Sequence, residues 1–156
     1  MSQTETSSDR IERDVVIEAP IETTWRIVTE PMYVSQWFCD KAEIDPRPGG
    51  KGFLHWDEHG TSPLQVVAFE PSTYFAFRWV FPEGEEPRHG NSVLVEFTLT
   101  QVGDQTHLHL VESGFEATLW PAAEKIKFRT EHEAGWDELL GKLVAYGAKS
   151  QVPVRY

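Results

Sequence analysis

Apolar and polar residues alternate at every second position in several segments of the chain, and near its end they recur every three to four positions. Residues 11–18 follow the two-residue period, as do five later segments separated by Gly, Pro, Asp or Ser clusters: 52–58, 63–70, 73–81, 92–100 and 106–113. A period of two is typical of half-buried strands, and turns between consecutive strands favour antiparallel pairing. The pattern predicts one strand and then a run of five.

Two short helices are predicted between the first strand and this run. Ile21, Trp25 and Val28 recur on one face after Pro20, and proline suits the first turn of a helix. Residues 31–38 again begin with proline and predict a second helix, after which the chain becomes extended.

A long helix is predicted from about residue 122 to residue 149, where the period becomes helical. One side of it carries a wide apolar stripe with one histidine: His132, Trp136, Leu139, Leu140, Leu143 and Gly147. Glycine in a helix costs about 1 kcal/mol relative to alanine. Because Gly135, Gly141 and Gly147 all fall within this segment, the helix must be stabilised by packing on the sheet.

These elements predict an α+β fold, a curved antiparallel sheet wrapped around a long C-terminal helix, with two short helices after the first strand. The 156 residues fit a single domain over 11–150. Residues 1–10 are polar and are expected to be a disordered tail, and 151–156 a C-terminal tail. The acidic segment 81–92 is predicted to be an exposed, mobile loop.

The strand periods also predict which side chains point inward. The segments 73–81, 92–100 and 106–113 place these residues on their inner faces: Phe75, Phe77, Trp79 and Phe81; Val93, Val95, Phe97 and Leu99; Leu108, Leu110 and Glu112. A curved sheet and a straight helix do not meet flush, so large side chains or a ligand must fill the space between them. The candidate cavity-lining residues are Trp37, His55, Phe75, Phe77, Trp79, Val95, Phe97, Leu108, Leu110, Glu112, His132, Trp136, Leu139, Leu140 and Leu143.

Glu112 is the one acid in these inward rows. A carboxylate facing a cavity is desolvated unless it is paired. It is either a structural acid held by a partner, or a general acid or base or an acceptor for a ligand hydroxyl.

The histidines do not predict a metal site. In the string from His132 to Trp136 a tryptophan stands where a zinc helix needs its second histidine. His107 and His109 alternate with leucines and are expected to face solvent, with no acid or thiol nearby in sequence. The face of His55 stays open, because Phe53 and His55 compete with Leu54 and Trp56 for the inside. No metal and no cofactor is expected.

The charge of the chain excludes some partners. With 25 acidic and 14 basic residues its formal net charge is −11, which repels nucleic acid and anionic lipid. No segment is apolar enough for a membrane span or a signal peptide. A single cysteine, Cys39, fits a reducing compartment and is expected to be an inert thiol. A cytoplasmic protein, monomeric or homodimeric, is expected.

The order of motifs resembles one family. IEAPIETTWRIVTEP, then Trp37, IDPRPGG, VVAFEPSTYFAFRW, VESGF and the late pair Gly135-Trp136 are similar to single-domain proteins related to the C-terminal domain of the activator of heat-shock protein 90 ATPase. These belong to the helix-grip superfamily of START, polyketide-cyclase and birch-pollen-allergen proteins (SRPBCC).

The resemblance implies the helix-grip fold and three candidate functions. The first is binding of an apolar or amphipathic small molecule, such as a lipid, polyketide or hormone, between the sheet and the C-terminal helix. The second is a stress-response protein that modulates a chaperone ATPase, although the eukaryotic co-chaperone uses a further N-terminal domain for which this chain has no room. The third is a cyclase or hydrolase with Glu112 as acid or base.

Overall fold

The computed structural model describes residues 10–80, 86–88 and 90–149. The predicted tails, 1–10 except Arg10 and 151–156, lie outside these residues, as do Phe81 and much of the acidic loop. Within the described ranges no helix is long and apolar enough to cross a membrane.

Within the described residues, seven antiparallel strands form one sheet. They are β1 (Arg10–Ile17), β2 (Lys41–Ile44), β3 (Lys51–Trp56), β4 (Gly60–Glu70), β5 (Tyr74–Val80), β6 (Ser92–Val102) and β7 (Gln105–Ser113). Their order across the sheet is β1-β7-β6-β5-β4-β3-β2. The strand before the helices and the run of five after them are confirmed, and β2 adds a short edge strand in the segment that the sequence marked only as extended.

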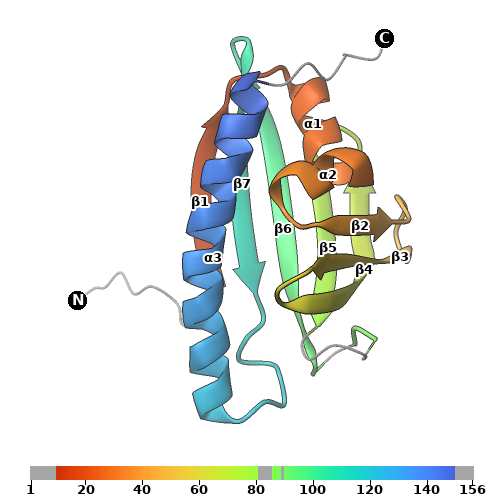
Figure 1. Cartoon of the computed structure of the whole chain (residues 1–156), viewed down its shortest axis with the longest axis vertical. Helices are drawn as coiled ribbons and strands as arrows, with labels where there is room; N and C mark the ends of the chain where they lie inside the picture. The colour runs from red at the N-terminus through yellow and green to blue at the C-terminus, as the bar shows by residue number, and fades with distance from the viewer. Residues whose placement is uncertain (1–9, 81–85, 89, 150–156) are drawn as a thin grey trace, which may run out of the picture.

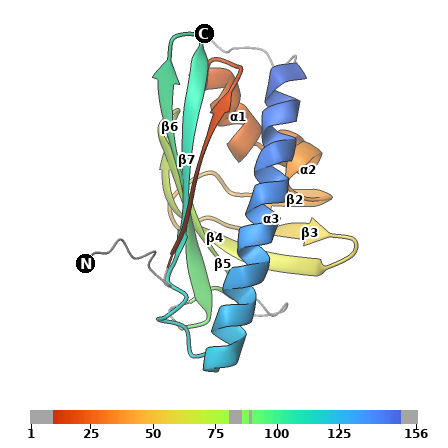
Figure 2. The same cartoon turned by 90° about the vertical axis from the view of Figure 1, so that its left-hand side faces the viewer.

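In the part of the chain that the structure describes, three helices cover one face of the sheet (Figures 1 and 2). The two short ones are α1 (Ile21–Thr29) and α2 (Pro31–Trp37), and the long one is α3 (Ala122–Lys149). All three match the predicted segments. The fold class predicted from the periods, a curved antiparallel sheet closed by a long C-terminal helix, is therefore confirmed.

The strand faces follow the two-residue period. The predicted inward residues of β5, β6 and β7 are each at most 4% exposed: Phe75, Phe77, Trp79, Val93, Val95, Phe97, Leu99, Leu108, Leu110 and Glu112. A bulge in β4 between Val66 and Ala68 shifts its register with β5. Because bulges bend a strand, this one helps the β2–β3–β4 end of the sheet to curl toward the helices.

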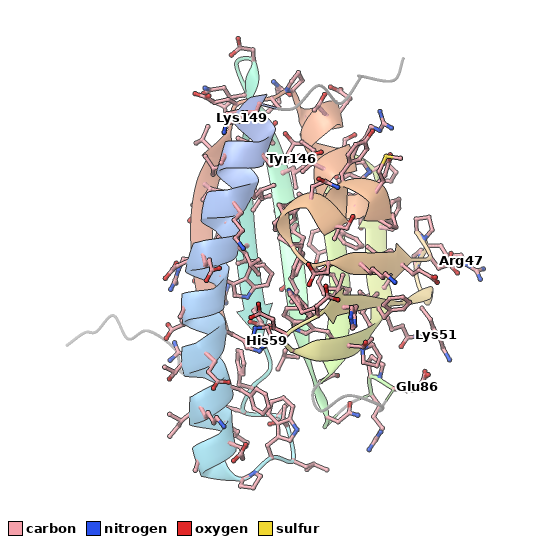
Figure 3. The ribbon with its side chains drawn as sticks, in the orientation of Figure 1. Arg47, Lys51, His59, Glu86, Tyr146 and Lys149 are labelled. Atoms are coloured by element: carbon pink, nitrogen blue, oxygen red, sulfur yellow. The ribbon has the colours of Figure 1, made fainter. Side chains whose placement is uncertain are left out.

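The acidic segment 81–92, predicted to be an exposed loop, is exposed only in part of its described residues. Glu86 is exposed and pairs with Lys51 at the start of β3, with 3.0 Å between the carboxylate oxygen and the ammonium nitrogen (Figure 3). Gly90, Asn91 and Ser92 are buried, and the Gly90 carbonyl accepts a hydrogen bond from the backbone amide of Leu119. The prediction of exposure is therefore wrong for the end of the loop, because the chain leading from β7 to α3 covers it.

The packing of α3 on the sheet is tight along its C-terminal half. Leu140 and Leu143 are at most 3% exposed. Gly147 lies so close to β1 that a Cβ at this position would overlap the side chain of Ile17. Leu140 and Leu143 belong to the hydrophobic core beneath this half of the helix.

Candidate functional site

Glu112 is completely buried and lies at the centre of a polar cluster that joins β5, β7 and α3. The two-residue period of β7 continues from Leu108 and Leu110 to Glu112, which brings the carboxylate under α3. It accepts hydrogen bonds from Nε1 of Trp79 (2.7 Å), Nε1 of Trp136 (2.8 Å) and Nδ1 of His132 (2.9 Å to each carboxylate oxygen). The carboxylate is thus held by three donors, two of them indoles.

Glu112 favours a proton on His132, and a protonated His132 would compensate the charge of the carboxylate. Burial alone would lower the pKa of His132, but the charge of Glu112 and its hydrogen bond raise it above the ordinary value of 6.5. A buried carboxylate is tolerated where such a partner and hydrogen bonds replace water. This geometry favours the paired, structural reading of Glu112, and its action as a general acid or base stays a prediction.

An open groove of about 540 Å³ lies beside this cluster, between α3 and the end of the β3–β4 hairpin. His59, in the turn between β3 and β4, is on the hairpin side of the groove (Figure 3). The residues that line the groove are Phe38, Trp56, His59, Trp79, Phe128, Glu131, His132, Gly135, Trp136, Glu138, Leu139 and Lys142. Its volume falls within the roughly 300–1,000 Å³ typical of small-molecule sites.

Aromatic rings in mutual contact make up much of the wall. The ring of Phe38 lies 5.4 Å from that of Trp136 and 5.7 Å from that of Trp79, between centroids. Trp56 lies 6.2 Å from Trp79, and its Nε1 donates to the Phe38 carbonyl at 2.8 Å. Since the indoles of Trp79 and Trp136 donate to Glu112, the three groove tryptophans all use their N–H groups within the protein.

The residues predicted to line a cavity fall into three sets: those at the groove together with Glu112, those in the core, and His55. Trp79, His132, Trp136 and Leu139 line the groove, and Glu112 bonds three of these four. Nine others are at most 3% exposed, contribute to the core and do not line the groove: Trp37, Phe75, Phe77, Val95, Phe97, Leu108, Leu110, Leu140 and Leu143. Trp37 donates its N–H to the Ile27 carbonyl at 3.0 Å. The hollow space therefore lies beside the helix–sheet interface.

His55 lies on the outer face of β3. Leu54 is buried, and the ring of Trp56 packs on Phe38 and Trp79 inside. His55 instead contacts the Thr61 hydroxyl at 2.7 Å and Asp57 at 3.1 Å. Neighbouring side chains of a strand point to opposite faces, so His55 faces away from Leu54 and Trp56 and does not line the groove.

Several groove residues were missed from the sequence. Phe128 lies four positions before His132 and Lys142 three after Leu139, so extending the helical spacing finds both. Trp56 could have been found from the two-residue period of β3, because it shares a face with the buried Leu54. His59 and Phe38 lie in a turn and after a helix end, where no periodicity indicates a face.

The outer-face histidines form a separate polar cluster. His107 and His109 lie on the outer face, as predicted, and each places a ring nitrogen 2.8 Å from the same carboxylate oxygen of Asp14. The hydrogen bond from His109, together with that from His107, lowers the pKa of Asp14. Asp14 is distant from these histidines in sequence, and the pairing of β1 with β7 brings it next to them. Within the described part of the chain, no group of three or more His, Cys, Asp or Glu residues is arranged to hold a metal ion.

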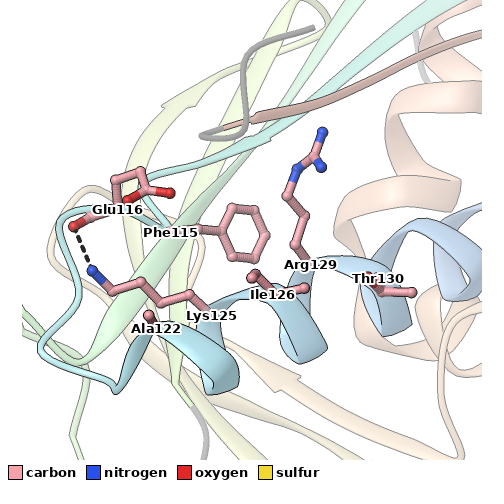
Figure 4. Close-up of a pocket in the computed structure, with 7 residues that line it drawn as sticks. All are labelled: Phe115, Glu116, Ala122, Lys125, Ile126, Arg129 and Thr130. Carbon is pink, nitrogen blue, oxygen red and sulfur yellow. Dashed lines mark hydrogen bonds between the residues drawn. The ribbon is translucent and has the colours of Figure 1, made fainter.

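A second cavity, of about 190 Å³, lies where the chain passes from β7 into α3 (Figure 4). The residues around it are Phe115, Glu116, Ala122, Lys125, Ile126, Arg129 and Thr130. The Lys125 ammonium donates to the Glu116 carbonyl at 3.0 Å across one side (Figure 4). It is smaller than usual ligand sites and contains none of the residues predicted from the sequence, so the groove is the stronger candidate.

The sequence matches the family model described as Activator of Hsp90 ATPase homolog 1-like protein over residues 18–148. No curated protein matches the chain. Protein MLL2253 from Mesorhizobium loti has a similar structure, with a TM-score of 0.76 and 23% identity over 91% of this chain and 98% of that chain. The Aha1 dimer from Colwellia psychrerythraea has a TM-score of 0.72 and 17% identity over 91% of this chain and 98% of that chain.

DynU16, a protein of the dynemicin biosynthetic locus, has a TM-score of 0.72 and 27% identity. The similarity covers 95% of this chain and 50% of DynU16, so the chain spans half of that protein's length. These similarities confirm the helix-grip fold that the motifs predicted.

Proposed function

Because the chain belongs to the family of Activator of Hsp90 ATPase homolog 1-like proteins, within the helix-grip superfamily, we propose that it binds an apolar or amphipathic small molecule. The site is the groove between α3 and the β3–β4 hairpin. The ligand lies against the aromatic wall, and its polar end reaches the rim.

The observation that carries this proposal is the lining of the groove. Trp56 and Phe128 are partly exposed and present aromatic surface to a hollow of about 540 Å³ that is open to solvent. Phe38, Trp79 and Trp136, which are at most 4% exposed, pack behind this surface. Burial of apolar surface contributes about 25 cal/mol per Å², so a ligand that covers these rings gains affinity without a strong polar contact.

The rim suits a ligand with one polar end. Its charged groups are Glu131, Glu138 and Lys142, with His59 on the hairpin side. The Lys142 ammonium lies 3.3 Å from the Glu138 carboxylate, and both side chains are largely exposed. Exposed charges stay hydrated and cost little to rearrange, so they tolerate a ligand head group rather than specify one.

Intrinsic fluorescence tests the proposal, since three tryptophans line the groove. Laurate and anthraquinone-2-sulfonate serve as probes, one a flexible chain and the other a flat ring system. We expect each probe to change the tryptophan emission saturably and to appear as a one-to-one complex in native mass spectra.

Leu139→Glu and Ala145→Glu form a matched pair on α3. Leu139 lines the groove, whereas Ala145 is exposed on the same helix and does not line it. A charge in the groove should weaken binding by about tenfold or more, equivalent to roughly 1.4 kcal/mol, while the control keeps wild-type affinity. The proposal fails if no probe binds the wild type, or if both variants bind equally well.

A chaperone-modulating role is the second candidate, and the description of the matched family supports it. A measurement of Hsp90 ATPase turnover with and without the full chain tests this role directly. An unchanged turnover together with no retention of the chaperone in a pull-down would remove it.

A further inference from the structure

The three glycines of α3 differ in what surrounds them. At Gly147 a Cβ would overlap Ile17, so the close approach of α3 to β1 requires glycine. At Gly135 and Gly141 nothing lies within 4 Å of the position that a Cβ would take. Glycine within a helix costs about 1 kcal/mol relative to alanine. Packing therefore explains Gly147 and leaves the other two without a structural reason.

Gly135 lies in the middle of the helix face that lines the groove. The groove residues of α3 recur at helical spacing: Phe128, Glu131, His132, Gly135, Glu138, Leu139 and Lys142. A side chain at 135 would project between its neighbours into open space, toward the aromatic wall on the other side. Gly141 is exposed and does not line the groove.

The opposite wall favours flat apolar rings. Across the groove from α3, the N–H groups of Trp56 and Trp79 donate to the Phe38 carbonyl and to Glu112, so these indoles present carbon surface rather than donors. Aromatic surfaces attract other rings in offset-stacked or edge-to-face contacts. A strip of helix backbone without a side chain, facing such a wall, leaves a slot suited to a planar molecule.

We propose that Gly135 is a specificity-determining residue of the groove: its missing side chain keeps the slot wide enough for flat, apolar ring systems to lie between α3 and the aromatic wall. This inference rests on the proposed function and adds to it the shape of the ligand. A methyl group at position 135 narrows the slot and excludes rigid rings, whereas a flexible chain adapts around it.

The test compares Gly135→Ala with Gly141→Ala, using the full chain and both anionic probes, anthraquinone-2-sulfonate and laurate. Both substitutions place alanine in an open helical position, so both variants should unfold at higher urea concentration than the wild type. We expect Gly135→Ala to bind anthraquinone-2-sulfonate about tenfold or more weakly, with laurate affinity reduced by less than about threefold. Gly141→Ala should bind both probes as the wild type does.

The outcomes separate the two proposals. If the wild type binds neither probe, the proposed function fails and this inference fails with it. If the wild type binds both probes and Gly135→Ala keeps its affinity for the flat one, only the role of Gly135 is overturned. An equal loss of both probes in Gly135→Ala also overturns it, because position 135 then does not discriminate by ligand shape.

Discussion

Glu112 shows how one buried acid organises a site that is otherwise aromatic. Its carboxylate is fully buried and accepts hydrogen bonds from His132 and from the indoles of Trp79 and Trp136. Charged acceptors form stronger hydrogen bonds than neutral ones, so this acid fixes the orientation of both rings. The shape of the groove wall thus depends on a residue that does not itself line the groove.

Replacement of this acid by its amide tests the arrangement. Glu112→Gln keeps the shape of the side chain but directs an NH₂ group at donors that need an acceptor. We expect the free energy of unfolding to fall by about 3 kcal/mol, because one partner of a buried charged pair is lost. Urea denaturation followed by circular dichroism measures it. Glu43→Gln, at an exposed glutamate of β2, is the control and should change stability little; equal effects would contradict the prediction.

His132 makes stability depend on pH in a defined direction. Its pKa in the folded protein is raised above 6.5 by Glu112 in spite of burial, so the folded state holds the proton more tightly than the unfolded chain. The contribution is complete below the unfolded pKa and is lost as the pH rises through the folded one. As the pH rises above about 6.5, the unfolding free energy should fall more steeply in the wild type than in His132→Gln. Parallel curves would show that His132 is not protonated in this way.

Among the elements, α3 has two functions along its length. Its C-terminal half packs on the core through Leu140, Leu143 and the close contact of Gly147 with Ile17. Its middle, around His132 and Trp136, forms one wall of the groove. Helical spacing alone predicts a single continuous apolar stripe. Whether a given turn packs in the core or lines the groove depends on how close the sheet lies to that turn.

The close contact at Gly147 gives a prediction for this helix. Gly147→Ala must displace Ile17 or the helix, and overpacking of this kind costs typically about 1–3 kcal/mol, more than the helix propensity that alanine adds. Gly141→Ala has open space and should instead stabilise the protein by up to about 1 kcal/mol. Thermal and urea denaturation of both variants provide the measurement, and stabilisation by Gly147→Ala would show that the contact is looser than described.

Across the whole molecule, α3 packs directly on the sheet at the β1 end and is separated from the β3–β4 hairpin by the groove at the other end. The β1 end meets α3 at Gly147, whereas the β3–β4 hairpin, beyond the bulge in β4, is separated from α3 by the groove. The aromatic core runs between the two ends, with ring contacts from Phe97 to Trp136 and from Trp136 to Phe38. One continuous core predicts that the domain unfolds as a single cooperative unit.

Cys39 reports on this cooperativity. It is 8% exposed, and burial raises the pKa of its thiol to about 11, so little reactive thiolate exists at neutral pH. We expect its labelling by a thiol reagent to be slow in the native protein and to increase with urea at the same midpoint as the far-ultraviolet circular dichroism. Labelling at urea concentrations that leave the circular dichroism unchanged would indicate that the α2–β2 side opens separately.

The sequence indicated much of the candidate site through local periodicity. Glu112, Trp79, His132, Trp136 and Leu139 were all identified by the face of a strand or helix on which they lie. The periodicity did not separate them from core residues, since both kinds of position point inward. That separation depends on how far one element lies from the next.

The order of strands and helices, the inward faces of β5, β6 and β7 and the need to cover α3 all follow from residue spacing, because the backbone of each element fixes where consecutive side chains point. The position of the hollow was decided by tertiary structure. The contact of Gly147 with Ile17 and the meeting of three donors at Glu112 join segments distant in sequence. Local spacing carries no information on such distances, so it could not place the groove beside α3.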